Sequence, residues 1–286
     1  MKRAFEFFFV VYVAAAVTVL LQNDMFGEVL ARVAVCWLVS LLFLTLVYAA
    51  ALARQRFDLV DTAWGLSIIA IAVTAYGIGG SSVGFNPQTV VTALIIVWGL
   101  RLAWHIGRRF LHSSTTDERY VQLMHKWKGS VAVNAYLRIY VVQSLLALFV
   151  SIPAIHINIS NGVSWTWWAF VGAGVWAVGF VCEVVADRQL AFFVAQPANK
   201  GKLMTNGLWK YARYPNYFGE LTVWWGIAIM SLGTPHGWVG TGGAAVITYL
   251  IVYISGIPPK ETRLRKREGW HGYVKTTRVL LPLRKH

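Results

Sequence analysis

Long apolar runs alternate with short polar or basic stretches along almost the whole sequence. A helix needs about 20 consecutive apolar residues to cross the hydrocarbon core of a bilayer, and most of these runs are near that length. The pattern predicts an all-α, polytopic membrane bundle of eight spanning helices, at about residues 4–21, 33–53, 59–80, 89–106, 139–157, 165–186, 215–232 and 238–257.

The first apolar run has a second interpretation. It follows Met1, Lys2 and Arg3 and contains three alanines at 14–16, as a secretory signal peptide with its cleavage region does. We favour a retained helix, because the run is long enough to span and further spans follow after a short polar break. If this first helix is loose or cleaved, the count of spanning helices is seven.

The composition agrees with a membrane protein. The chain has 286 residues, of which 57% are hydrophobic and 13% charged, and this excludes an ordinary soluble protein. No Rossmann domain is expected, because the glycines at 77–84 have the wrong spacing for a dinucleotide fingerprint and follow no predicted strand. Cys36 and Cys182 lie in apolar runs without metal-ligand spacing, so no metal site is expected. We expect residues 1–286 to form a single bundle.

The basic residues indicate how the bundle is oriented. When alternate loops are assigned to opposite sides of the membrane, all of the 26 lysines and arginines fall on one side except Arg32 and Arg101. Because cytoplasmic loops carry an excess of lysine and arginine, both termini are predicted to be cytosolic. The net charge of +14 is therefore explained by topology, and nucleic-acid binding is not expected, since no basic helix with interleaved aromatics stands apart from the spans.

Several ionisable residues lie inside the predicted spans. Each costs roughly 2.5–3.5 kcal/mol on insertion scales, so such residues pair with one another or line a wet cavity. All of them fall in the cytosolic half of their helices, which predicts a polar cavity that opens to the cytosol among the third, fourth, sixth and seventh spans. A purely structural network of ion pairs is the alternative for two or three of them. The residues are Asp61, Arg101, His105, Glu183, Asp187 and Glu220.

The stretch from Gly207 to Glu220 carries polar chemistry into the seventh span. Proline suits the first helical position, so Pro215 is predicted to begin the helix. Asn216, Glu220 and Trp224 then share one helix face at intervals of four residues. A helix N-terminus beside basic loops favours a phosphorylated ligand, although the same cations also suit anionic lipid headgroups.

Four segments resemble the steroid 5-alpha-reductase family, in particular its little-characterised membrane proteins. They are residues 207–220 (GLWKYARYPNYFGE), Glu183 to Leu190, Asp61 to Gly65 and Trp98 to Arg101. The resemblance covers the chain from about Arg56 onward, and residues 1–55, with the first two helices, lie largely outside it. The C-terminal half, about residues 165–286, is its most specific part and corresponds to the cofactor-binding half of the family.

The resemblance implies an all-helical reductase that takes NADPH from the cytosolic side. It would transfer hydride to a carbon–carbon double bond of a lipid or steroid-like enone. By family position, the residues expected to hold the cofactor are Arg101, Arg119, Glu183, Asp187, Lys202, Arg213, Asn216, Tyr217, Glu220, Trp224, Arg263 and Arg267.

Reduction of an enone also requires a group that stabilises the enolate oxygen. In the steroid reductases, a glutamate and a tyrosine from the early helices do this. Asp61 is the nearest counterpart of the glutamate here, whereas Trp98 stands at the tyrosine position. The candidate catalytic residues are Asp61, His105 and Tyr140. Tyr76 is a further residue that would take the place of the family's catalytic tyrosine. Tyr214 also departs from the family, which usually has histidine before the proline.

Two other functions stay open at this point. Membrane methyltransferases of the isoprenylcysteine and phospholipid type share a similar proline-containing stretch and bind S-adenosylmethionine, but they usually carry paired glutamates in the tail, where the stretch Lys260-Glu261-Thr262 of this chain offers one. A non-catalytic transporter or scaffold would use the buried charges as an ion path. The expected partners are the lipid bilayer and a hydrophobic small molecule. The expected location is the endoplasmic reticulum in a eukaryote or the inner membrane in a bacterium.

Overall fold

The computed structural model describes residues 26–281 apart from residue 82 and residues 113–114. Within these ranges every regular element is a helix, and the only β-type contact is an isolated bridge between Ala212 and Arg278. The predicted all-helical fold is therefore confirmed. The predicted first span, at 4–21, lies outside the described residues.

Six helical segments of the described chain are long and apolar enough to cross a membrane. They are Gly27–Arg54, Leu59–Ile78, Pro87–Leu111, Val131–Val150, Trp167–Ala195 and Gly237–Leu264. The chain is thus an integral membrane protein. Helix α10 (Pro215–Ser231) has 17 residues and begins at the proline that the sequence predicted. The count of eight spans stays a prediction.

The first three described helices pack side by side: α2 (Phe26–Arg54), α3 (Leu59–Ile78) and α4 (Pro87–Leu111). Asn86 caps α4, because its side chain accepts a hydrogen bond from the Thr89 backbone N–H at 2.8 Å. Helices α3 and α4 touch through backbone, since a Cβ at Gly65 would lie 2.9 Å from the Gly99 carbonyl oxygen. This close contact fixes where Asp61 and Arg101 stand relative to each other.

The middle of the chain differs from the prediction of one span at 139–157. After α5 (Glu118–Met124), a continuous helical segment runs through α6 (Val131–Ala135), the π-helix η1 (Tyr136–Val141) and α7 (Val142–Val150). It ends at Ser151, and α8 (Ile152–Ile159) begins as a separate helix with a proline in its first turn. Pro153 has no N–H to continue the helical hydrogen bonds, so the apolar run is broken there.

The sixth span, α9 (Trp167–Ala195), is nine residues longer at its C-terminus than the 165–186 predicted. It ends at Ala195, because Gln196 precedes Pro197 and the residue before a proline is disfavoured in a helix. Helix α9 packs closely against α10 at four glycines, Gly172 and Gly179 of α9 and Gly219 and Gly226 of α10. A Cβ at Gly219, for example, would lie 2.5 Å from the backbone nitrogen of Glu183.

The rest of the C-terminal half is built from shorter elements. The last predicted span is η4 (Gly237–Gly240), α11 (Thr241–Tyr249) and the π-helix η5 (Leu250–Ile254), followed by α12 (Ile257–Leu264). The segment between α9 and α10 contains two 3-10 turns, η2 (Pro197–Asn199) and η3 (Gly207–Lys210), and α13 (Trp270–Thr276) packs near them.

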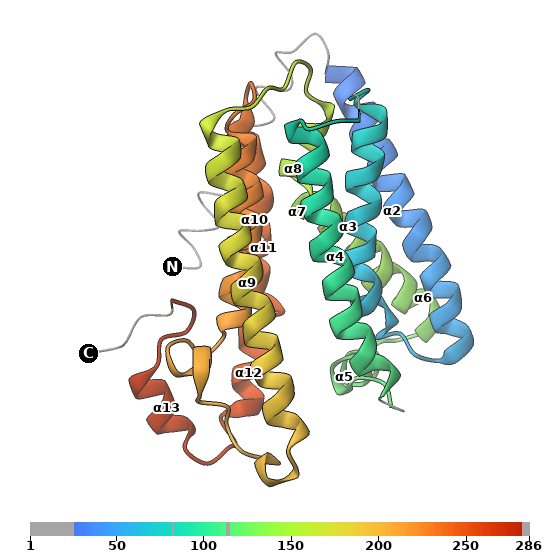
Figure 1. Ribbon diagram of the computed structural model, residues 1–286. Helices are drawn as coiled ribbons and strands as arrows, with labels where there is room; N and C mark the ends of the chain where they lie inside the picture. Colours follow the sequence, from blue (N-terminus) through green and yellow to red (C-terminus); the bar gives the residue numbers. More distant parts are fainter. Residues whose placement is uncertain (1–25, 82, 113–114, 282–286) are drawn as a thin grey trace.

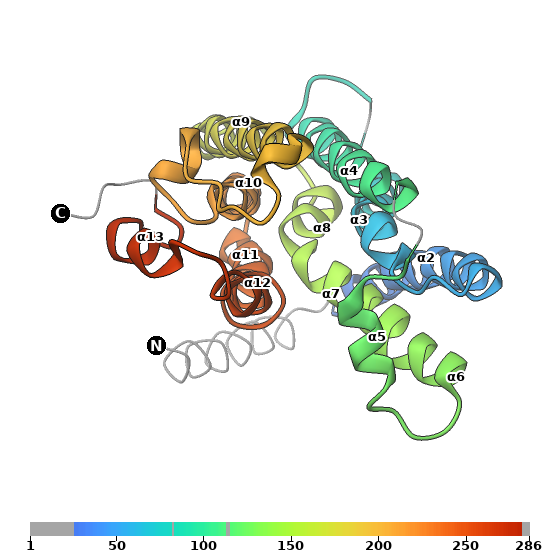
Figure 2. The same ribbon diagram turned by 90° about the horizontal axis from the view of Figure 1, so that it is seen from below.

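The helices form two groups (Figure 1). Helices α2, α3 and α4 stand on one side, α9, α10, α11 and α12 stand on the other, and α7 and α8 lie between them (Figure 2). The main core runs through both groups and contains the fully buried indoles of Trp98 and Trp224. The short helices α5, α12 and α13 gather at one end of the bundle, where α4 and α9 end and α10 begins.

Candidate functional site: a buried polar network between α4, α9 and α10

Arg101 on α4 binds two carboxylates of α9. Its Nη1 donates to Glu183 Oε1 at 2.5 Å, and its Nη2 donates to Asp187 Oδ2. The side chains of Arg101, Glu183 and Asp187 are only 15%, 3% and 8% exposed. Glu183 and Asp187 are one turn apart on α9, so one guanidinium reaches both. The structure thus brings together three residues that the sequence had placed in a cavity.

Helix α10 completes this network from the opposite side. Asn216 Nδ2 donates to Asp187 Oδ1 at 3.2 Å, and the ring of Trp224 meets the ring of Trp98 edge to face, with 5.1 Å between centroids. Trp98 Nε1 in turn donates to Glu183 Oε2 at 3.2 Å. Asn216 and Trp224 therefore face the same neighbours, as their spacing predicted.

Two further titratable side chains border the network. Glu220 lies between Asn216 and Trp224 on the same face, makes no hydrogen bond to another described residue, and interacts electrostatically with Asp187. His105 Nε2 lies 3.6 Å from Asp187 Oδ2, one turn after Arg101. The Arg101 network, as we call it, comprises Trp98, Arg101, His105, Glu183, Asp187, Asn216, Glu220 and Trp224.

Lys260 at the start of α12 adds a cation that sequence reasoning missed. Its Nζ lies 4.1 Å from the centroid of the Tyr217 ring, and its charge acts on Asp187 and Glu220. Lys260 follows Pro258 and Pro259 directly, at the predicted end of the last span, and this position could have suggested that it lies near the site. Because Lys260 belongs to a basic tail in the sequence, we did not predict that its side chain points into the bundle.

Two polar atoms of the Arg101 network have no partner among the described residues. They are Asn216 Oδ1 and Trp224 Nε1, and both are buried. Trp64 Nε1 is a third such atom, and its ring lies 6.3 Å from that of Trp98. Buried polar atoms are nearly always hydrogen-bonded, so these atoms indicate where a ligand would supply an acceptor or a donor.

Asp61 belongs to a second cluster, between α3 and α5. Tyr120 Oη donates to Asp61 Oδ1 at 2.5 Å, and Arg119 Nη2 donates to Asp61 Oδ2 at 2.8 Å. Arg119 also binds Asp117, the residue that caps α5. Burial raises the pKa of Asp117, but the hydrogen bonds and the charge of Arg119 outweigh burial and hold it below its ordinary value. We refer to Asp61, Asp117, Arg119 and Tyr120 as the Asp61 cluster.

Tyr120 is the functional candidate that the sequence did not indicate. It is buried, and its hydroxyl points at the carboxylate that was expected to act on substrate. Its position in a basic loop gave no helical or charge pattern to predict this contact. The Asp61 cluster and the Arg101 network approach each other at Tyr217, because the charges of Arg119, Glu220 and Asp187 all act on its hydroxyl.

Tyr140 lies apart from the Arg101 network. It is fully buried, and its hydroxyl donates to the backbone oxygen of Phe57 at 3.1 Å. Its ring meets Tyr48 of α2 edge to face, with 5.2 Å between centroids. These contacts give Tyr140 a place in the packing between α2, η1 and the start of α3.

The remaining predicted cations lie in and around the C-terminal segments. Arg213 Nη2 donates to Glu261 Oε1 at 2.8 Å and Nη1 to the Thr277 backbone oxygen at 3.3 Å, so its guanidinium ties α12 and α13 to the start of α10. Arg267 Nη1 donates to the Lys202 backbone oxygen at 2.5 Å. The side chains of Lys202 and Arg263 are exposed.

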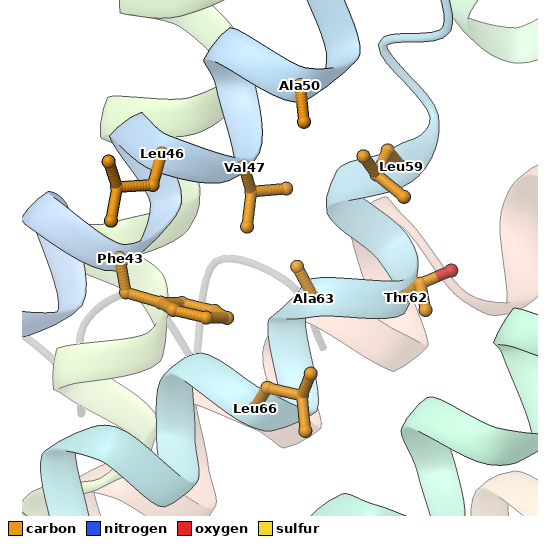
Figure 3. A pocket seen from close by; sticks show the side chains of 8 residues that line it. All are labelled: Phe43, Leu46, Val47, Ala50, Leu59, Thr62, Ala63 and Leu66. Carbon is orange, nitrogen blue, oxygen red and sulfur yellow. The ribbon is translucent and has the colours of Figure 1, made fainter.

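An apolar groove of about 370 Å³ lies between α2 and α3. Figure 3 shows its lining, in which Thr62 supplies the only polar side chain. The other lining residues are Phe43, Leu46, Val47, Ala50, Leu59, Ala63 and Leu66. None of them belongs to the Arg101 network, so this groove and the polar network are separate features of the bundle.

Residues 47–277 match the model of a protein family described as "Protein of unknown function (DUF1295)". The chain belongs to this family. The match spans both the Arg101 network and the Asp61 cluster, so both are parts of the family's domain.

Curated relatives of this DUF1295 chain confirm the resemblance to steroid 5-alpha-reductases. The chain is 36% identical over 77 residues to "Steroid 5-alpha-reductase DET2" of Gossypium hirsutum, covering 27% of the chain and 28% of the relative. It is 30% identical over 115 residues to "3-oxo-5-alpha-steroid 4-dehydrogenase 1" of Homo sapiens, covering 39% and 40%.

A relative of another kind is also found. The chain is 41% identical over 64 residues to "Probable O-methyltransferase ustE" of Ustilaginoidea virens, covering 22% of each protein. The matched segments thus span less than half of each of these relatives. No solved structure matches the chain.

Proposed function

We propose that this protein is a membrane-embedded, NADPH-dependent oxidoreductase that reduces a carbon–carbon double bond of a lipid or steroid-like enone. The observation that carries the proposal is the Arg101 network, in which three helices distant in sequence converge on buried carboxylates and an amide with an unpartnered oxygen. Such groups are expensive inside a membrane and mark functional sites there. The names of the steroid reductase relatives support the choice of reaction.

The residues of the network fit the nicotinamide half of the cofactor. Asn216 Oδ1 is an unused acceptor for the carboxamide N–H₂, and the carboxylate of Asp187 suits a hydroxyl group of ribose. Phosphates do not fit beside these carboxylates. They would be held by cations further out, namely Arg119, Lys202 and Arg263, with Arg267 next to Lys202. The cofactor supplies hydride when it is bound.

The enolate oxygen that hydride transfer creates needs a donor from this chain. His105 borders the Arg101 network, and Asp61 holds the hydroxyl of Tyr120 directly against its carboxylate. We propose His105 and the Asp61–Tyr120 pair as the candidate donors in place of Tyr140, which lies apart from the Arg101 network, against Tyr48 and Phe57. Trp98 stays a positioning residue, because its indole N–H is bonded to Glu183.

Ligand-dependent thermal stability tests the proposed function. Purified protein in detergent is heated with NADPH, NADH or S-adenosylmethionine at equal concentrations, and Tm is recorded. Binding at 100 times Kd adds about 2.7 kcal/mol to the free energy of unfolding, so NADPH should raise Tm by several degrees and NADH by less. If NADPH leaves Tm unchanged at millimolar concentration, the reductase proposal is wrong.

The methyltransferase is the second candidate, because one relative is named as a probable O-methyltransferase. The cofactor would then be S-adenosylmethionine, whose ribose hydroxyls and sulfonium also suit the carboxylates of the Arg101 network. A rise in Tm with S-adenosylmethionine alone would establish this candidate in the experiment above.

We also propose that the end of the bundle with α5, α12 and α13 faces the cytosol, together with both termini. The lysines and arginines of the loops support this orientation. In a chain whose Cys36 and Cys182 are replaced by alanine, the single cysteine of Lys202→Cys should react with a membrane-impermeant maleimide only when the cytosolic face is accessible. Labelling from the opposite face would reverse the orientation.

A further inference from the structure

The Arg101 network together with the neighbouring Lys260 contains more carboxylates than permanent side-chain cations. Glu183, Asp187 and Glu220 contribute three formal negative charges, whereas Arg101 and Lys260 contribute two positive charges. Arg109 acts on Lys260 and on His105, and Arg263 acts on Lys260, but both arginines lie outside this set. The formal charges of the five side chains in the set therefore sum to −1.

Glu220 is the carboxylate with the weakest compensation. Arg101 donates hydrogen bonds to both Glu183 and Asp187, but Glu220 accepts none from another described residue. Its electrostatic neighbours are Asp187, Lys260, Arg101 and Glu183. Two of these four are carboxylates, so Glu220 stands in a region that favours an additional positive charge.

A separate observation indicates that a ligand group occupies this region. Trp224, one turn after Glu220 on α10, is fully buried, and its Nε1 has no hydrogen-bond partner among the described residues. Leaving such a buried donor unpaired is unfavourable. An under-compensated carboxylate and an unpaired buried donor on one helix face thus mark a place for a ligand that is both polar and cationic.

We infer that Glu220 stabilises the positive charge that hydride transfer leaves on the nicotinamide ring, so that the site discriminates in favour of NADP⁺ over NADPH. This inference rests on the proposed function. Hydride transfer moves one hydrogen with two electrons from the dihydronicotinamide to the β-carbon of the enone, and a proton then adds to the α-carbon. The cofactor is left oxidised, with a cationic pyridinium ring. A fixed carboxylate beside the ring is a preorganised stabiliser of that charge.

The test measures the dissociation constants of NADP⁺ and NADPH by calorimetry for the wild type and for Glu220→Gln at low ionic strength. Glutamine preserves the shape of the side chain, and no hydrogen bond of Glu220 is lost, so the variant should fold normally. Removal of one nearby charge in a low-dielectric site should weaken NADP⁺ binding about tenfold and NADPH binding less than about twofold. The ratio of the two dissociation constants is the readout, and it does not require turnover.

Glu268→Gln is the matched control, because it removes the same charge from an exposed position outside the Arg101 network. Its ratio of dissociation constants should equal that of the wild type. Suppose that the wild type binds both nucleotides and that Glu220→Gln weakens the binding of both equally or of neither. In that case the inference is wrong and the proposed function stands.

Two other results would overturn the inference together with the proposed function. One is a wild type that binds neither nucleotide. The other is a wild type that binds S-adenosylmethionine but neither nicotinamide nucleotide, and whose preference for S-adenosylmethionine over S-adenosylhomocysteine, which lacks the sulfonium charge, is lost in Glu220→Gln. In that case Glu220 would serve a sulfonium, and the pyridinium assignment would be wrong.

Discussion

The Arg101 network and the Asp61 cluster are built from the same residue types but differ in what surrounds them. Arg101 is 15% exposed and binds carboxylates that are 3% and 8% exposed, whereas Arg119 is 50% exposed and Asp61 24%. The first joins helices distant in the sequence, and the second attaches one short helix to the start of α3. The buried ion pairs of the Arg101 network therefore connect the two groups of helices, whereas the more exposed ion pair of the Asp61 cluster fixes only the short helix α5 at the end of the bundle.

The comparison predicts its largest effect at Arg101. Arg101→Leu leaves Glu183 and Asp187 buried without their cation, and breaking such a pair from one side costs about 3–5 kcal/mol. Tm in detergent should fall markedly. Arg54→Leu, which removes an exposed arginine at the end of α2, should leave Tm nearly unchanged. Equal stability of Arg101→Leu and the wild type would remove the distinction between the two regions.

The backbone contact beneath the network gives the next largest effect. A Cβ at Gly219 would lie 2.5 Å from the backbone nitrogen of Glu183, so Gly219→Ala must push α10 away from α9. Overpacking of this kind costs about 1–3 kcal/mol. Gly174→Ala on α9 is the control, because its Cβ would meet no atom within 4 Å. The two variants should differ in Tm, and matching values would mean that α9 and α10 can separate at no cost.

Asn216→Ala tests whether the Arg101 network binds the cofactor, because its main expected effect is on NADPH binding and not on the stability of the bundle. The variant loses one hydrogen bond to Asp187 and the unpartnered Oδ1 atom that we assign to the cofactor. We expect the dissociation constant for NADPH to rise about tenfold, equivalent to about 1.4 kcal/mol. Asn206→Ala, at an exposed position before η3, serves as control. An unchanged dissociation constant would contradict the assignment of Asn216.

Asp61→Asn should have the smallest effect on stability. The amide oxygen still accepts from Tyr120, and the lost attraction to the half-exposed Arg119 is worth less than about 1 kcal/mol. Unfolding at low and high salt measures it, because screening should remove most of the difference from the wild type. A loss as large as that of Arg101→Leu would show that the Asp61 cluster is as important to the bundle as the Arg101 network.

The sequence predicted the parts of the fold that depend on local pattern. Apolar runs located the helices, and the four-residue spacing in α9 and α10 placed Glu183, Asp187, Asn216 and Trp224 on facing surfaces. The proline at 153 indicated that the helix breaks there, but the apolar run is long enough for one span, so we predicted a single helix. The extension of α9 was missed because polar residues after Asp187 look like a loop when a helix is assumed to end with the membrane.

The contacts between distant residues were beyond prediction. Trp98 meets Glu183, 85 positions later in the chain, and Tyr120 meets Asp61, 59 positions earlier. No periodicity links such residues, because their proximity depends on how helices pack and where short helices such as α5 settle. The sequence could therefore indicate which charges share a membrane depth, but not which of them pair.

The bond between Arg101 and α9 also has a consequence for the order in which the protein is made. Arg101 enters the membrane while its first carboxylate partner is still 82 residues from synthesis. At about 5–20 residues per second, the arginine waits roughly 4–16 s before Glu183 exists. During that interval α4 must be held by the insertion machinery, by lipid headgroups or by water. A ribosome that stalls after α8 would release a chain whose fourth helix has no neutralising partner in α9, a form suited to recognition by membrane quality control.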